Sequence, residues 1–320
     1  MERHFEFTGE TKVVEDMGRE VVLHRIRCTK ANGHVNVGEE GGFIEREGNM
    51  IGSRCWVGDE AMVYGDAVVK DEAIVFGTAK ISDSAEVSGS AQVFGLSRVY
   101  EHSKVFGHAV VRDNAVVQGN AQVYDSAELS GSALVYDNAC VYGDSFVTRN
   151  GEVCGDAKVY GKASIAGHAY ITDEAEVYDH AILHGGVIYE KARVYGTSNV
   201  YGHVEVFGEA KVGGDCGLRG SCKVYGRALV SGSSDIYGDA EVFGEARVYG
   251  HAEVYGRAKV YGKSKVYEQS EVYGSAQVGD SAEVFGTAHV EGVVVDKAKV
   301  GGVAQVPSGV VVSGSSVLLS

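Results

Sequence analysis

Aliphatic residues recur at every sixth position over most of this chain. One series runs without a break from Val57 to Leu183, and a second runs from Ile188 to Val290. Four residues after each aliphatic residue comes a small one, most often alanine, as at Ala61. A period of six does not fit the 3.6-residue repeat of an amphipathic helix. It fits short strands, in which side chains alternate between the two faces, separated by a tight turn in every unit.

The repeating unit reads aliphatic, variable, Gly or Asp, polar, small, charged, as in the segment 242–247. Gly or Asp in the third position tolerates the positive φ of a tight corner. Three such hexads close a triangle of 18 residues. The pattern therefore predicts an all-β fold, a triangular β-solenoid over residues 51–320 with about 15 coils, each stacked on the next at the spacing of strands in a sheet.

The first fifty residues lack the hexad. Lys12 to Leu23 is typical of two strands around a turn at Met17 and Gly18. Because solenoids need their open ends covered, residues 1–50 are predicted to form a small N-terminal β-hairpin cap.

The hexads resemble those of the hexapeptide-repeat superfamily, and the match covers residues 51–320. The resemblance implies a single-stranded left-handed parallel β-helix. The N-terminal string, with Gly38-Glu-Glu-Gly-Gly-Phe-Ile-Glu and Cys55-Trp-Val-Gly-Asp-Glu-Ala, resembles the YdcK-like branch found in prophages, which is labelled transferase on fold alone. Acyltransferases of the superfamily use acetyl-CoA and build their active site from a projecting loop and a trimer partner. No insertion interrupts either long series here.

The regular spacing fails at a few points. From Leu183 to Ile188 the step is five residues, and Gly185 and Gly186 lie inside it. Two further five-residue steps are expected between Val290 and Val300, with Val295 as the aliphatic residue between them. Either these steps are neutral deletions or they mark a bend beside a site.

Histidines are the candidates for catalysis. His180 and His184 resemble the metal-binding segment of γ-class carbonic anhydrases, but that family spaces the two histidines five residues apart and here the spacing is four. His184 could alternatively act as the general base of acyl transfer. His168 and His203 are two coils apart, about 10 Å, which is too far for one metal ion to bind both. No metal site is predicted, and the other corner histidines are interpreted as exposed surface residues.

Aromatic residues often follow the aliphatic position. Eight of them are predicted to stack in ladders and to form a binding surface: Phe106, Tyr124, Tyr142, Tyr160, Tyr178, Tyr195, Tyr249 and Tyr267. The first six are spaced 18 residues apart, or 17 across the short step, and the last two are 18 apart. Stacked rings stabilise neighbouring strands, and tyrosine is also enriched at interfaces. Both interpretations stay open.

Composition narrows the function classes. The formal net charge of −15 disfavours a nucleic-acid surface. No apolar run is long enough for a membrane helix and no signal peptide is evident. Six cysteines without a C-x-x-C pair are typical of free thiols in a reducing compartment, so a cytoplasmic location is expected.

These observations favour a non-catalytic structural or binding solenoid that displays aromatic ladders, takes no cofactor and associates with itself, as a trimer or end to end. A protein or glycan partner is left open. The first alternative is an acyltransferase of the hexapeptide type that uses acetyl-CoA. The second is a degenerate protein similar to the γ-carbonic anhydrases.

Overall fold

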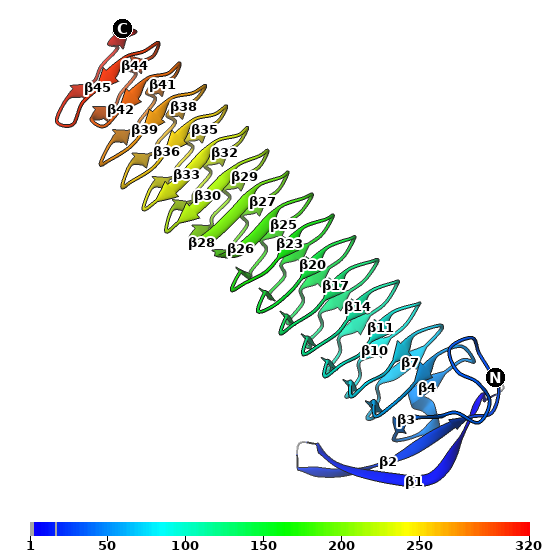
Figure 1. Cartoon of the computed structure of the whole chain (residues 1–320). Coiled ribbons are helices and arrows are strands. Elements are labelled where there is room, and N and C mark those ends of the chain that lie inside the picture. Colours follow the sequence, from blue (N-terminus) through cyan, green and yellow to red (C-terminus); the bar gives the residue numbers. More distant parts are fainter. Residues whose placement is uncertain (1–2, 17) are drawn as a thin grey trace. The chain divides into compact units, whose positions relative to one another are not determined.

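Short parallel strands stacked as solenoid coils make up nearly all of the fold (Figure 1). The computed structural model describes residues 3–16 and 18–320, and it divides into two compact units, Met1–Gly161 and Lys162–Ser320. The chain makes about 15 turns of about 18 residues, with strands arranged as in a triangular β-helix. The all-β solenoid expected from the hexads is confirmed. Among the described residues, no helix combines the length and apolar character that crossing a membrane requires.

Each regular coil contains three strands of two residues, and each strand pairs in parallel with the strand 18 residues later. In the first unit one such coil consists of β11 (Gln92–Val93), β12 (Arg98–Val99) and β13 (Lys104–Val105). Its strands pair with β14 (Val110–Val111), β15 (Val116–Val117) and β16 (Gln122–Val123). In the second unit, β34 (Glu241–Val242) pairs in the same way with β37 (Lys259–Val260).

The core of each coil is filled by the aliphatic and small residues of the hexads. Val93 and Ala91 in the first unit and Val242 and Ala240 in the second are fully buried. Serine in the small position satisfies its hydroxyl locally, since the Ser103 Oγ donates to the Tyr100 carbonyl at 2.7 Å. Large and small inward side chains therefore alternate through a narrow, buried interior.

All six cysteines are free thiols, as expected. Cys216 and Cys222 take the place of alanine in the inward small position and are fully buried. Burial raises the pKa of Cys222 to about 12. These two thiols are therefore packing residues with little thiolate character.

Corners adopt positive φ at glycine, at aspartate or glutamate, and at Arg149. Asp113 has a φ of 63°, and its Oδ2 accepts a hydrogen bond at 2.9 Å from the N–H of Gly131, the equivalent corner residue of the next coil. A Cβ on Gly95 would lie 2.8 Å from the Asp113 nitrogen, because stacked corners approach closely. Glycine and aspartate thus share the corner position for different reasons.

The N-terminal residues form antiparallel strands. β1 (Phe5–Asp16) pairs with β2 (Arg19–Cys28), which pairs with β3 (Glu40–Ile44), as Figure 1 shows. β3 then pairs in parallel with β6 (Met62–Val63) of the solenoid, and a single 3-10 turn, η1 (Glu47–Asn49), follows β3. The expected pair of strands is present, and Met17 of the expected turn lies outside the described residues.

A hydrophobic cluster joins these strands to the first coils. Leu23 and Phe43 pack with Met62 and Tyr64, and Leu23 is fully buried. The Phe43 ring is also covered by the Arg25 guanidinium, 4.3 Å from its centroid. The first coil is therefore covered by side chains from β2 and β3. The division into a cap of residues 1–50 and a solenoid of residues 51–320 stays a prediction.

Near the C-terminus the expected step lengths are wrong. The inward residue after Val290 is Val294, not Val295. β43 (Val293–Val294) pairs with β40 (Gln277–Val278), so that Val294 stands opposite the inward Val278, and the Val294 side chain is fully buried. One four-residue step followed by one six-residue step replaces the two five-residue steps. The shortened corner needs Gly292, where a Cβ would lie 2.4 Å from the Val310 carbonyl oxygen.

Candidate functional site

Aromatic ladders run along the coils of both units. In the first unit, Phe106, Tyr124, Tyr142 and Tyr160 stack with ring centroids 4.8–5.0 Å apart and planes within 5° of parallel. In the second unit, Tyr178 stacks on Tyr195 at 5.2 Å, across the short step, and Tyr249 stacks on Tyr267 at 5.0 Å. All eight predicted ladder residues therefore stack within their own units, and each is half-buried.

The longest ladder of the second unit is absent from the predicted set. It has five rings with centroids 4.8–5.4 Å apart: Tyr189, Phe207, Tyr225, Phe243 and Tyr261. All five are spaced 18 residues apart along the chain. The spacing rule that gave the other ladders would have found this one as well.

Tyrosine hydroxyls in these ladders are anchored to glutamates of the neighbouring coil. Tyr225 donates to Glu241 at 2.9 Å. Tyr255, which stacks on Tyr237 in a further ladder, donates to Glu271 at 3.1 Å. Burial, with a smaller contribution from the bonded glutamate, raises the pKa of each of these tyrosines to about 12. The rings are held by stacking and by the hydroxyl, so the ladders present rigid, partly exposed aromatic edges.

The five-residue step near His184 lies in an unusually long strand. β26 (Ile182–Ile188) continues through the corner, with its first residues paired to β23 (Ser164–Ile165) and its last to β24 (Tyr170–Ile171). It pairs on its other edge with β28 (Asn199–Val206), which pairs with β30 (Gly217–Gly220). In this register His184 stands opposite Tyr201, and their rings stack at 5.1 Å. His184 is exposed, on an outward position of β26.

The residue lost in this step is the outward corner residue. Gly185 pairs with Gly202, and Val187 pairs with Glu205, so Gly186 alone stands opposite two residues, His203 and Val204. A Cβ on Gly186 would lie 3.5 Å from the Cβ of Val204, which is fully buried. Gly186 therefore takes the inward position. Val204, at a position where other coils have a small residue, lies beside Gly186 in the core.

A cleft of about 580 Å³ opens at this step. Its lining includes three exposed imidazoles, His168, His184 and His203, above the buried glycines Gly185 and Gly186. The sequence interpretation placed His168 and His203 two coils apart and did not connect them with His184. His180 does not line the cleft; it lies at the preceding corner, where its N–H donates to the Gly196 carbonyl at 2.8 Å. Among residues 3–16 and 18–320, no group of three metal-ligating side chains has the geometry to hold an ion.

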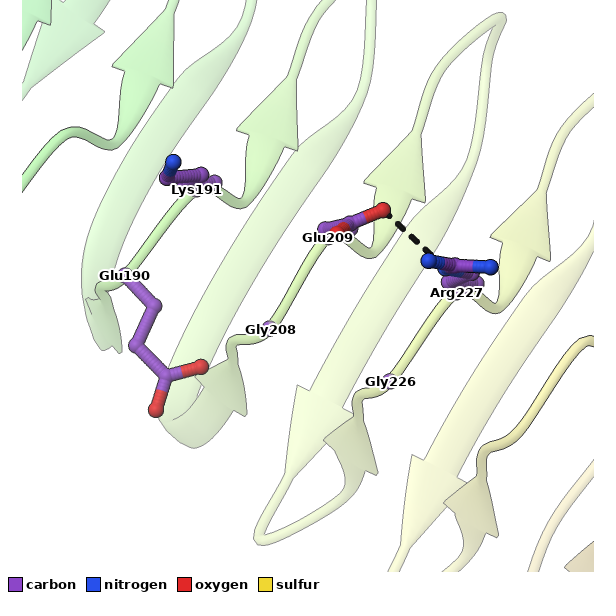
Figure 2. A pocket seen from close by; sticks show the side chains of 6 residues that line it. All are labelled: Glu190, Lys191, Gly208, Glu209, Gly226 and Arg227. Atoms are coloured by element: carbon purple, nitrogen blue, oxygen red, sulfur yellow. Dashed lines mark hydrogen bonds and ion pairs between the residues drawn. The ribbon is translucent and has the colours of Figure 1, made fainter.

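A second hollow of about 460 Å³ lies over the corners at Gly208 and Gly226. Figure 2 shows its charged side chains: Arg227 pairs with Glu209 at 3.1 Å, and Glu190 points away from both. These side chains are exposed, and exposed ion pairs of this kind contribute little binding energy. This hollow lacks the converging polar groups of a ligand site.

Comparison of the chain with known protein families and with curated proteins gives no match in either case. The functional argument therefore depends on the ladders and on the histidine cleft.

Proposed function

We propose that this chain is a non-catalytic binding solenoid of the hexapeptide-repeat type, which contacts its partner through the aromatic ladders, the partner being a second copy of the chain. The observation that carries the proposal is the set of ladders with ring spacings of 4.6–5.4 Å, repeated coil after coil. Rigid tyrosine edges supply contact area at a small cost in side-chain entropy.

Exposed apolar side chains of the last coils support self-association. Val311 and Val317 are each 61% exposed, and Leu319 is 54% exposed. They lie on or beside β46 (Val311–Val312) and β47 (Val317–Leu318). Val311 and Val317 stand opposite the outward residues Val293 and Lys299 of the coil before. Burial of these side chains against a second copy would remove apolar surface from water and so favour a contact on the outward face of the last coils.

Two variants separate the ladders from the apolar coil. In the first, Tyr124→Ser and Tyr142→Ser remove two rungs of a ladder, and in the second, Val311→Lys and Val317→Lys place charges on the last coils. We expect the ladder variant to lower the association constant measured by sedimentation equilibrium at least tenfold, with the circular dichroism spectrum unchanged. The lysine variant tests the contact at the last coils in the same assay. If the ladder variant associates as the wild type does, the proposal is wrong.

The acyltransferase alternative keeps one supporting observation, the exposed His184 beside a cleft large enough for a small molecule. A general base contributes roughly 100-fold or more to a rate. His184→Ala should therefore lower acetyl transfer from acetyl-CoA by at least that factor if this alternative holds, and His180→Ala should not. The alternative similar to the γ-carbonic anhydrases has less support, because His180 and His184 do not line one cleft.

A further inference from the structure

The lost corner residue leaves a gap in a column of side chains. His168 lies on one side of the gap, in the coil whose Ile165 pairs with Leu183 of the short-step coil. His203 lies on the other side, in the coil whose Gly202 pairs with Gly185 of the short-step coil. The level between them has no residue at the outward corner position, because Gly185 is followed directly by the inward Gly186. We call this place the corner gap, defined by His168, Gly185, Gly186 and His203.

The corner gap has the height of one aromatic ring. Adjacent coils lie about 4.8 Å apart, so His168 and His203 belong to levels about 10 Å apart. Rings of this protein that stack on neighbouring levels have centroids 4.6–5.4 Å apart. One further flat ring placed at the empty level would therefore lie at the protein's own ladder spacing from both imidazoles.

Stacking already occurs at the edge of the gap. His184, on the same cleft, stacks on Tyr201 with their planes 16° apart. The lining also includes Val187 and Tyr189, which offer apolar contact, while each imidazole offers a hydrogen-bond donor or acceptor. A cleft of about 580 Å³ is large enough for a small heterocyclic molecule.

The charges around the cleft limit the class of ligand that it can bind. Glu205 lines the cleft, and its carboxylate is paired with Lys223 at 2.9 Å. No lysine or arginine lines it, and the chain has a net charge of −15. A phosphorylated ligand would therefore be disfavoured.

We propose that the corner gap binds an uncharged planar nitrogen heterocycle, which stacks between His168 and His203 as the missing ring of the column. The two imidazoles that would hold the ring, His168 and His203, belong to no ladder, although Tyr189 of the five-ring ladder lines the same cleft. Either proposal can fail without the other.

The test uses the full chain labelled with ¹³C at histidine and titrated with nicotinamide in the presence of EDTA. Cyclohexanecarboxamide, which has the same amide but no flat ring, is the matched control ligand. We expect saturable shifts at the imidazoles of His168, His184 and His203, none at His180, and at least about tenfold weaker binding of the saturated amide. Equal binding of the two amides, or no shift up to the solubility limit of nicotinamide, would overturn the proposal.

Four variants complete the test. His168→Ala and His203→Ala should each weaken nicotinamide binding about tenfold, the size of one lost stacking contact, whereas His180→Ala should leave it unchanged. A serine inserted between Gly185 and Gly186 restores the six-residue step and fills the gap, so it should abolish binding. Unchanged affinity in both alanine variants would contradict the proposal, even if the insertion variant does not fold.

Discussion

At the scale of single residues, the backbone conformation of the corners limits which residue types can stand there. Asp113 combines a positive φ of 63° with a carboxylate that accepts the N–H of Gly131. The left-handed region disfavours residues that carry a Cβ, but aspartate recovers part of that cost through its local hydrogen bond. This accounts for the predominance of glycine and aspartate at the third position of the hexad, which glutamate and Arg149 also occupy at positive φ.

Substitutions of Asp113 separate the two effects. Asp113→Gly loses the hydrogen bond to Gly131 but removes the strain of positive φ. Asp113→Ala loses the bond and keeps the strain. We expect the alanine variant to be less stable than the glycine variant by about 1 kcal/mol in urea denaturation. Equal stability of the two variants would show that φ does not limit this position.

Gly186 tests the packing of the short step. Its φ is +83°, and a Cβ would lie 2.9 Å from the Val204 carbonyl oxygen, whereas Gly309 has nearly the same φ, +82°, and open space around it. Gly186→Ala should destabilise the chain by about 1–3 kcal/mol more than Gly309→Ala, because only Gly186 adds a steric clash to the strain. Thermal denaturation of the two variants gives the comparison, and similar losses would mean that the contact with Val204 relaxes easily.

At the scale of elements, the stacked strands hold the aromatic ladders in register. Each strand pairs with its counterpart 18 residues later, so identical positions of successive coils carry their rings to stacking distance, as with Tyr124 and Tyr142. The bond from the Tyr225 hydroxyl to Glu241 then joins one coil to the next through side chains as well as through the backbone. The ladders are therefore both a stabilising feature and a rigid surface.

Alkaline pH should weaken this arrangement. Burial raises the pKa of Tyr225 to about 12 in the folded chain, whereas an unfolded tyrosine titrates near 10. The stabilisation is thus fully present below about pH 10 and is lost as the pH rises toward 12, because the unfolded chain releases the proton first. Urea denaturation between pH 9 and pH 12 should show a steeper loss for the wild type than for Tyr225→Phe. Parallel curves would contradict this assignment.

The strands show which parts of the fold could be predicted from the sequence. Hexads with one inward aliphatic residue and one small residue determine the register unambiguously, so the coils and eight ladder residues could be predicted. The prediction was wrong at Val295 because residues 293–295 are all valine, and a run without alternation does not show which side chain faces inward. The histidine cleft could not be predicted, since the spacing reveals a lost residue but not whether the inward or the outward one is missing.

At the scale of the whole molecule, about 15 coils repeat the same outward pattern with few interruptions. Among the described residues, the clearest candidate for a small-molecule site is the cleft at the first short step. The outward feature that repeats from coil to coil is the aromatic ladder. The central claim is therefore that the chain works by displaying these rings to a second copy of itself.

Light scattering across a concentration series tests this claim most directly. One chain has a mass of 33.8 kDa. The account predicts a weight-average mass above that value, which rises with concentration and falls when the ladder rungs Tyr124 and Tyr142 are replaced by serine. A mass of 33.8 kDa at every concentration would contradict self-association and remove the main support for a surface-binding role.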